Sequence, residues 1–260
     1  MNTVRRIAKN TIVLLIAQIV TMALGFFYVM YTARYLGAEG FGVLSFGLAF
    51  TGIFSVFTDL GLSQLTVREV ARNKTLASKY IGNIMTMKLF LVSITLVLII
   101  FFINVLGYPK NTIYVVYFLS ASIILNGFIQ SFKSIYQAYE KMEYVSLFNI
   151  LNTIFLLAGV LIAINQQFNV IAFAAIYFVT SFIILTLNIF VLQIKFTKFS
   201  FLIEMDFWKT TLKEAFPFGL SGIFVVIYFY IDSVMLSLMK SDEVVGWYNA
   251  SYKLVFILLF

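Results

Sequence analysis

Residues 144–194 read YVSLFNILNTIFLLAGVLIAINQQFNVIAFAAIYFVTSFIILTLNIFVLQI, a run of 51 residues without one Asp, Glu, Lys or Arg. The run is interrupted by a polar cluster, Asn165–Gln167 followed by Asn169. A helix needs about 20 residues to cross the hydrocarbon core of a bilayer, because each residue adds about 1.5 Å. The run therefore predicts two membrane-spanning helices joined by a turn at residues 165–169.

The composition of the whole chain also indicates a membrane protein. Hydrophobic residues make up 62% of the chain, charged residues 11%, and the mean hydropathy is +1.00, whereas soluble domains carry about 25% charged residues. The chain has no Cys and no His, which excludes disulfides, thiolate chemistry, Cys/His metal sites and His acid–base catalysis. We expect no cofactor and no bound metal.

Apolar runs predict the fold class, an all-α polytopic membrane protein with seven full transmembrane helices and a truncated eighth. The predicted spans are 11–33, 41–62, 89–107, 113–131, 145–164, 169–193, 216–239 and 245 onward. The first run is too long for a cleaved signal peptide, whose apolar core has about 7–15 residues.

The distribution of basic residues predicts the orientation. Of the 18 Lys and Arg residues, 14 fall on one set of alternate connections and three on the other. The first set is Arg5, Arg6, Lys9, Arg68, Arg72, Lys74, Lys79, Lys88, Lys133, Lys141, Lys195, Lys198, Lys209 and Lys213, and the second is Arg34, Lys110 and Lys240. Because basic loops stay in the cytoplasm, we expect a cytoplasmic N-terminus in the cell (plasma or inner) membrane. The net charge of +7 lies in these short connections and does not indicate nucleic-acid binding.

An internal repeat indicates two lobes. Residues 38–45 and 242–249 align at an offset of 204, which pairs Glu39 with Glu243 and Gly42 with Gly246. We expect a six-helix lobe at 1–193, a cytoplasmic amphipathic linker at 194–215 and the start of a second lobe at 216–260.

The predicted linker and the last span carry further expectations. In the linker, Asp206 is expected to cap an interfacial helix and Pro217 to open the seventh span; a basic segment held near anionic lipid is the alternative. The eighth span has run for about 16 of the roughly 20 residues it needs when the sequence ends. We therefore expect the sequence to be a fragment of a longer protein.

Three motifs carry a family resemblance. They are Tyr35-Leu-Gly-Ala-Glu-Gly-Phe-Gly-Val-Leu-Ser-Phe-Gly47, Asp59-Leu-Gly-Leu-Ser-Gln-Leu-Thr-Val-Arg-Glu-Val-Ala-Arg-Asn73 and Leu212-Lys-Glu-Ala-Phe-Pro-Phe-Gly-Leu-Ser-Gly222. The chain resembles the polysaccharide (O-unit, Wzx-type) flippase family of the multidrug/oligosaccharidyl-lipid/polysaccharide exporter superfamily. This resemblance implies the first lobe of a two-lobe, MATE-like exporter. It also implies a polyprenyl-diphosphate-linked oligosaccharide as substrate and polysaccharide polymerases as partners.

Charged residues within the predicted spans are candidate functional residues, because a charge at the centre of a bilayer costs at least about 2.5–3.5 kcal/mol. Asp59 either pairs with Arg68 or Lys88 to hold the fold or takes part in gating or cation coupling. Asp232 and Lys253 lie at similar predicted depths, so they either form an ion pair or leave Lys253 free to meet a phosphate.

The remaining candidates lie near the ends of the spans. Arg34 either binds diphosphate or snorkels to lipid headgroups. The candidate substrate-binding residues are thus Arg34, Arg68, Lys88 and Lys253, and the candidate ion-coupling or gating residues are Asp59 and Asp232. The amides of Gln18, Asn126, Gln130, Asn149, Asn152 and Asn188 are expected to bond between helices or to line a sugar-binding cavity.

Three functions fit these features: a lipid-linked oligosaccharide flippase, a cation-coupled multidrug or metabolite exporter, and a polytopic membrane enzyme. An enzyme is the weakest of the three, because the outer loops are short and show no cluster of acids or metal ligands. No phosphate-binding loop of the Gly-x-x-x-x-Gly-Lys-Ser/Thr type is present, which excludes that kind of ATP-driven transport. A diphosphate substrate requires cations in the cavity, whereas a cationic drug requires acids.

Overall fold

The computed structural model describes residues 3–198 and 200–259, which form eight α-helices and two short 3-10 helices, with no strand among them. In chain order these elements are α1 (Thr3–Ser55), η1 (Val56–Thr58), α2 (Leu62–Arg72), η2 (Lys74–Leu76), α3 (Ala77–Val105), α4 (Lys110–Ala138), α5 (Met142–Asn165), α6 (Val170–Lys195), α7 (Met205–Met239) and α8 (Asp242–Leu259). The all-α fold class predicted from the sequence is confirmed. Phe260 and the side chain of Arg6, both used in the sequence predictions, lie outside the described part.

The apolar surface of the bundle suits a membrane environment. Six of the described helices are long and apolar enough to cross a bilayer. Large hydrophobic side chains such as Phe101, Phe190 and Phe224 are exposed on the outside. Helices satisfy their own backbone hydrogen bonds, which is what hydrocarbon requires. The chain is therefore a multi-pass membrane protein.

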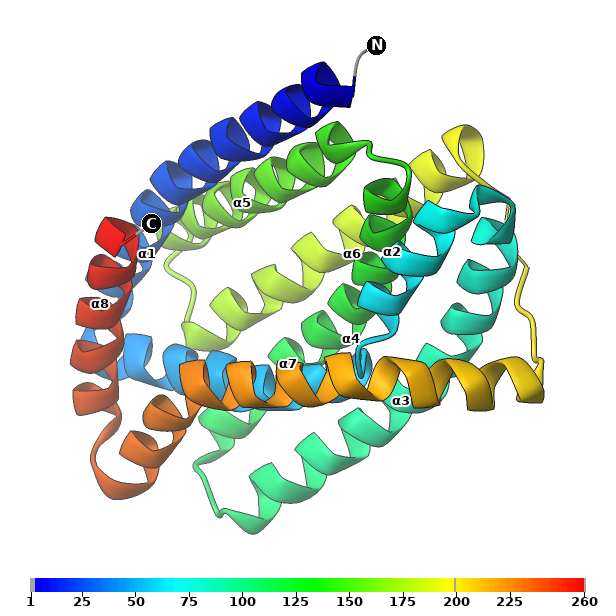
Figure 1. Cartoon of the computed structure of the whole chain (residues 1–260). Helices are drawn as coiled ribbons and strands as arrows, with labels where there is room; N and C mark the ends of the chain where they lie inside the picture. Colours follow the sequence, from blue (N-terminus) through cyan, green and yellow to red (C-terminus); the bar gives the residue numbers. More distant parts are fainter. Residues whose placement is uncertain (1–2, 199, 260) are drawn as a thin grey trace.

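Helix α1 bends at Gly37, which has φ 68° and ψ −178°. This region of backbone conformation is open to glycine and strained for other residues. Figure 1 shows the two parts of α1 running in different directions on either side of the bend. A straight helix of 53 residues would be about 80 Å long, far more than the bilayer is thick, so the bend lets the chain turn back. The number of crossings, seven complete and an eighth, stays a prediction.

The connections lie at two ends of the bundle. At one end, the Tyr139 hydroxyl donates to the Lys74 carbonyl at 3.3 Å, and Ser78 Oγ donates to the Lys198 carbonyl at 2.9 Å. At the other end, the Tyr35 hydroxyl donates to the Phe168 carbonyl at 3.1 Å. We call the first the basic end (connections 56–76, 139–141 and 196–204) and the second the opposite end. This agrees with the predicted grouping of connections on two sides, while the side that faces the cytoplasm stays a prediction.

Several predicted boundaries are wrong. Helix α3 begins at Ala77 rather than at residue 89, and α4 continues to Ala138 rather than ending at 131. Consequently Lys88 and Lys133 belong to helices and not to connections. Hydropathy places these two lysines outside the spans because it cannot register that a charge is buried among partners inside the protein.

The prediction for the start of α7 is also wrong. The expected interfacial helix is continuous with the seventh span, with Pro217 inside it, and the N-cap is Glu204 rather than Asp206. The Glu204 carboxylate pairs with Lys79 Nζ at 2.7 Å, and its backbone N–H donates to Asn83 Oδ1 at 3.0 Å. Hydrogen bonding to Lys79 lowers the pKa of the Glu204 carboxyl. These contacts fix Glu204, at the start of α7, to α3 at the basic end.

The two repeat motifs pack against each other at the opposite end. A Cβ added at Gly42 would lie 1.7 Å from the Asp242 carbonyl oxygen, and one added at Gly246 would lie 2.0 Å from the Ala38 carbonyl oxygen. Asp242 is the repeat partner of Ala38, so the contact exchanges equivalent residues, as a two-fold interface does. Figure 1 shows α8 beside α1 at this end of the molecule. The contact supports the internal repeat inferred from two identities.

We expect labelling of single cysteines to reveal the orientation. The chain has no Cys, so a cysteine placed at Asn111 or Ser241 should react with an impermeant maleimide from outside the cell. A cysteine at Lys141 or Lys198 should react only after permeabilisation, because the basic end is retained in the cytoplasm. The reverse pattern would show that the N-terminus is extracytoplasmic.

We also expect Gly42→Ala and Gly246→Ala to destabilise the protein. Each added methyl group collides with a backbone carbonyl, and such overpacking costs about 1–3 kcal/mol. Gly25→Ala is the matched control in the same helix, because a Cβ there meets nothing within 4 Å. Thermal melting in detergent measures all three, and equal melting temperatures for Gly42→Ala and Gly25→Ala would contradict the close contact.

Candidate functional site

A cavity of about 480 Å³ lies between α1, α4, α6, α7 and α8. Ten of its 17 lining residues carry a hydroxyl or amide group, while most of the surface that lines it is apolar. The residues that line it are Ser45, Leu48, Ala49, Thr51, Gly52, Ser55, Leu119, Ser122, Ile123, Asn126, Tyr177, Phe229, Tyr230, Ser233, Asn249, Tyr252 and Lys253. We call this space the central cavity.

Small residues of α1 open the central cavity. Gly42, Ser45, Ala49 and Gly52 share one face of α1, and small side chains on one face permit the close approach of another helix. In the structure, one part of that face contacts a helix and another part lines the cavity. Gly42 lies against the backbone of α8, whereas Ser45, Ala49 and Gly52 line the cavity. The ring of Tyr230 in α7 covers Gly52.

A hydrogen-bond network holds the polar wall of the cavity. Asn126 Nδ2 donates to Ser181 Oγ at 3.0 Å, and the hydroxyls of Ser122 and Ser181 lie 2.8 Å apart. The hydroxyls of Tyr28 and Tyr177 lie 2.6 Å apart behind this wall. The network uses the Nδ2 donor of Asn126. Asn126 Oδ1 has no protein partner among the described residues, so it can accept a bond from a ligand.

Lys253 brings a positive charge to the central cavity. Its Nζ lies 5.4 Å from the centre of the Phe41 ring, a cation–π distance. The lining residues include no Asp or Glu, and within the described part of the chain Lys253 forms no ion pair. The cavity therefore combines hydroxyls, amides and one ammonium group, a set that suits an anionic, hydroxyl-rich ligand.

The predicted ion pair between Asp232 and Lys253 is wrong for the part of the chain that the structure describes. Asp232 instead accepts hydrogen bonds from the Tyr248 hydroxyl and from the Ser233 backbone N–H. Tyr248 and Lys253 are five residues apart on α8, which places them about 140° apart around the helix. Asp232 therefore contacts the face of α8 that carries Tyr248, whereas Lys253 lies on a different face of the same helix. The similar predicted depths of Asp232 and Lys253 in the membrane do not bring them together.

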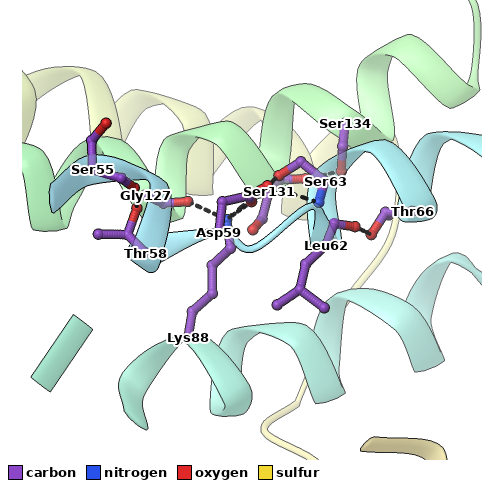
Figure 2. Close-up of polar contacts among 10 residues, drawn as sticks. All are labelled: Ser55, Thr58, Asp59, Leu62, Ser63, Thr66, Lys88, Gly127, Ser131 and Ser134. Atoms are coloured by element: carbon purple, nitrogen blue, oxygen red, sulfur yellow. Dashed lines mark hydrogen bonds and ion pairs between the residues drawn. The ribbon is translucent and has the colours of Figure 1, made fainter. Parts of the chain in front are cut away.

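Asp59 and Lys88 form a buried ion pair (Figure 2). Lys88 is fully buried, and its Nζ lies 2.6 Å from Asp59 Oδ1 and 2.6 Å from the Gly127 carbonyl oxygen. Asp59 Oδ1 also accepts from Ser63 Oγ at 2.5 Å. Of the two partners that the sequence offered for Asp59, the structure selects Lys88.

This ion pair fixes an irregular joint. Between α1 and α2 the chain passes through η1 and then through Leu60 and Gly61, which have φ 46° and 83°. Lys88 comes from α3 and Gly127 from α4, so one ammonium group connects three parts of the bundle near the basic end. The charges of Asp59 and Lys88 therefore balance each other within the protein.

The other predicted site residues lie away from the central cavity. Arg68 Nη2 pairs with Glu214 at 2.5 Å and its Nε with Glu69 at 2.6 Å, which joins α2 to α7. Arg34 is exposed near the bend of α1. The sequence did not single out Asn249 and Tyr252, because nothing in it shows which face of α8 meets the cavity.

We expect removal of either partner of the buried ion pair to destabilise the protein by about 3–5 kcal/mol, because the remaining charge is left in low dielectric. Asp59→Asn and Lys88→Met should each lower the melting temperature in detergent, and the double variant should recover most of the loss. Arg68→Gln is the control, since its ion pair with Glu214 is exposed and should contribute little. Additive losses in the double variant would contradict the pairing.

Comparisons with known proteins agree with this architecture. The sequence matches the family described as "Polysaccharide biosynthesis protein" over residues 7–260. It is 27% identical over 253 residues to a protein of Shigella dysenteriae named "Putative O-antigen transporter", covering 95% of this chain and 62% of that protein. The chain thus spans less than two thirds of the length of this relative.

Solved structures show the same fold at low identity. An inward-facing multidrug resistance MATE family transporter of the MOP superfamily has a TM-score of 0.68 at 16% identity, covering 91% of this chain and 58% of that chain. A MOP superfamily transporter from Pyrococcus furiosus, described as having a binding pocket of reversed polarity, has a TM-score of 0.62 at 15% identity, covering 96% and 60%. The chain therefore belongs to the polysaccharide biosynthesis protein family, as a multi-pass membrane protein with a MATE-like fold.

Proposed function

We propose that this protein moves a polyprenyl-diphosphate-linked oligosaccharide from the cytoplasmic to the outer leaflet of the membrane. The observation that carries the proposal is the central cavity, which offers one lysine and several hydroxyl and amide groups and in which the described residues place no acid. The family assignment and the O-antigen transporter name of the relative support it.

The chemistry of the central cavity suits each part of such a substrate. The Lys253 ammonium meets the diphosphate as a point charge. Asn126 and Asn249, together with the serine and tyrosine hydroxyls, offer hydrogen-bond partners to sugar hydroxyls. A volume of about 480 Å³ lies in the range of small-ligand sites, about 300–1,000 Å³, so it holds the diphosphate and the first sugars while the polyprenyl tail stays in lipid.

The same lining argues against the multidrug exporter. A cationic drug needs a carboxylate in the cavity, and the two acids expected to serve ion coupling are engaged elsewhere. Asp59 is neutralised by Lys88, and Asp232 accepts from Tyr248 away from the cavity. Fold similarity alone does not decide between the two functions.

The proposed mechanism is alternating access between two lobes. The contact between Gly42 and Gly246 holds α1 against α8 at the opposite end, which we predict to face outward. The substrate enters from the cytoplasmic side, and separation of the two glycine motifs then exposes the cavity outside. The buried Asp59–Lys88 pair keeps the joint near the basic end rigid during this movement.

We expect the whole protein to relieve accumulation of lipid-linked oligosaccharide in the cytoplasmic leaflet of a host that lacks its own flippase. Lys253→Gln should fold normally but lose at least tenfold in transport rate, and Lys253→Arg should retain part of it. Lys240→Gln is the matched control, because Lys240 is exposed at the opposite end and outside the cavity.

Two results would decide against this proposal. Drug resistance without glycan transport would establish the exporter function instead. Normal transport by Lys253→Gln would show that the central lysine does not contact the substrate. Adding Asp232→Asn to Lys253→Gln should not restore transport, since the two residues do not pair.

A further inference from the structure

A second polar cleft, of about 260 Å³, lies between α1, α4, α5 and α6. Its lining residues are Thr21, Asn126, Ile129, Lys133, Phe148, Asn149, Asn152, Thr153 and Ile184. We call it the Lys133 cleft. Lys133 is five residues and Asn126 twelve residues from the end of α4, so the cleft reaches from about 8 Å to about 18 Å inside the basic end.

Lys133 carries a charge that no acid neutralises among the described residues. Its Nζ donates to Asn149 Oδ1 at 2.6 Å, and none of the cleft residues is Asp or Glu. This differs from Lys88, the other lysine inside the helical bundle near the basic end, which has a carboxylate partner. An intramembrane charge without a counter-ion is costly and marks a functional site.

The cleft also holds amide groups that are free to bind a ligand. Asn149 uses its oxygen to accept from Lys133, which leaves its Nδ2 donor unused within the described part of the protein. The side chain of Asn152 has no protein partner there either. These donors line the same cleft as the ammonium group, and together they suit the oxygens of a phosphate group.

The Lys133 cleft lies next to two other spaces. It shares Asn126 with the central cavity, and it shares Thr21 and Asn149 with a third cavity of about 330 Å³ between α1 and α5. Leu14 and Leu15 line that third cavity and are exposed on the outer surface of the bundle. The three spaces thus lie in succession from the lipid-facing side of α1 and α5 to the central cavity, separated by shared polar residues.

We propose that the Lys133 cleft is a diphosphate-binding site that a lipid-linked substrate occupies before it reaches Lys253. The inference rests on the proposed function and adds a second binding site within it. The diphosphate lies against Lys133, Asn149 and Asn152, and the polyprenyl chain remains in lipid between α1 and α5. From there, the headgroup passes Asn126 into the central cavity, so the two unpaired lysines mark two successive positions.

The test measures equilibrium binding of a fluorescent polyprenyl diphosphate to the purified whole protein. The Lys253→Gln background removes the contribution of the central lysine. In that background, Lys133→Gln should weaken binding at least tenfold, Asn152→Leu should weaken it about threefold, and Lys133→Arg should retain most of it. Lys141→Gln is the matched control, because Lys141 is an exposed lysine at the same end of the bundle.

Competitors identify the recognised group. Inorganic diphosphate should displace the probe, and phosphatidylglycerol at equal concentration should not. Equal displacement by phosphatidylglycerol would overturn the proposal, since the site would then bind phospholipid headgroups in general. Unchanged binding in Lys133→Gln would also overturn it, and melting temperatures show whether each variant is folded.

The transport assay separates failure of this site from failure of the proposed function. Binding that depends on Lys133 in a protein that transports no glycan would leave the site standing and refute the function. If the protein transports glycan and the Lys133→Gln change affects neither binding nor transport, the site is refuted and the function stands.

Discussion

Hydrocarbon offers no hydrogen bonds, so every backbone polar group inside the membrane needs a partner within the protein, and a charge there is costly without one. This constraint explains why the described chain is helical almost throughout and why its buried charges are arranged as they are. Asp59 and Lys88 neutralise each other, and Asp232 takes hydrogen bonds from Tyr248 and the backbone of Ser233. Against this background, Lys133 and Lys253 stand out, because each lines a cavity in which the described residues place no acid.

Two kinds of contact hold the bundle at its two ends. Near the basic end, the ammonium of Lys88 connects the α1–α2 joint with α3 and α4. At the opposite end, Gly42 and Gly246 let two backbones approach without side chains between them. The first contact is strong and directional, whereas the second depends on shape alone and has two-fold symmetry. In the proposed mechanism the glycine contact separates when the cavity opens outward, whereas the Lys88 contact holds the α1–α2 joint, α3 and α4 together.

The fold is shared with multidrug transporters, so the fold does not identify the substrate. What distinguishes this chain is the lining of its cavities. The central cavity presents hydroxyls, amides and one lysine, and the Lys133 cleft adds a second lysine with amides around it. Under the proposed function this lining meets an anionic headgroup with attached sugars, and the described residues place no carboxylate there for a cationic drug.

The sequence by itself determined the membrane character, the helical class and the alternation of connections between two sides. These properties follow from the length of apolar runs and the placement of basic residues, which act along the chain without reference to neighbours. The repeat of Gly42 in Gly246 and the family resemblance were also visible there. Only the tertiary structure showed that α3 begins before Lys88, that α7 continues through Pro217 and that Asp232 does not meet Lys253. Hydropathy gives the depth of a residue but not the direction in which its side chain points around the helix. That direction, set by packing between helices, decided which charges pair and which ones line a cavity.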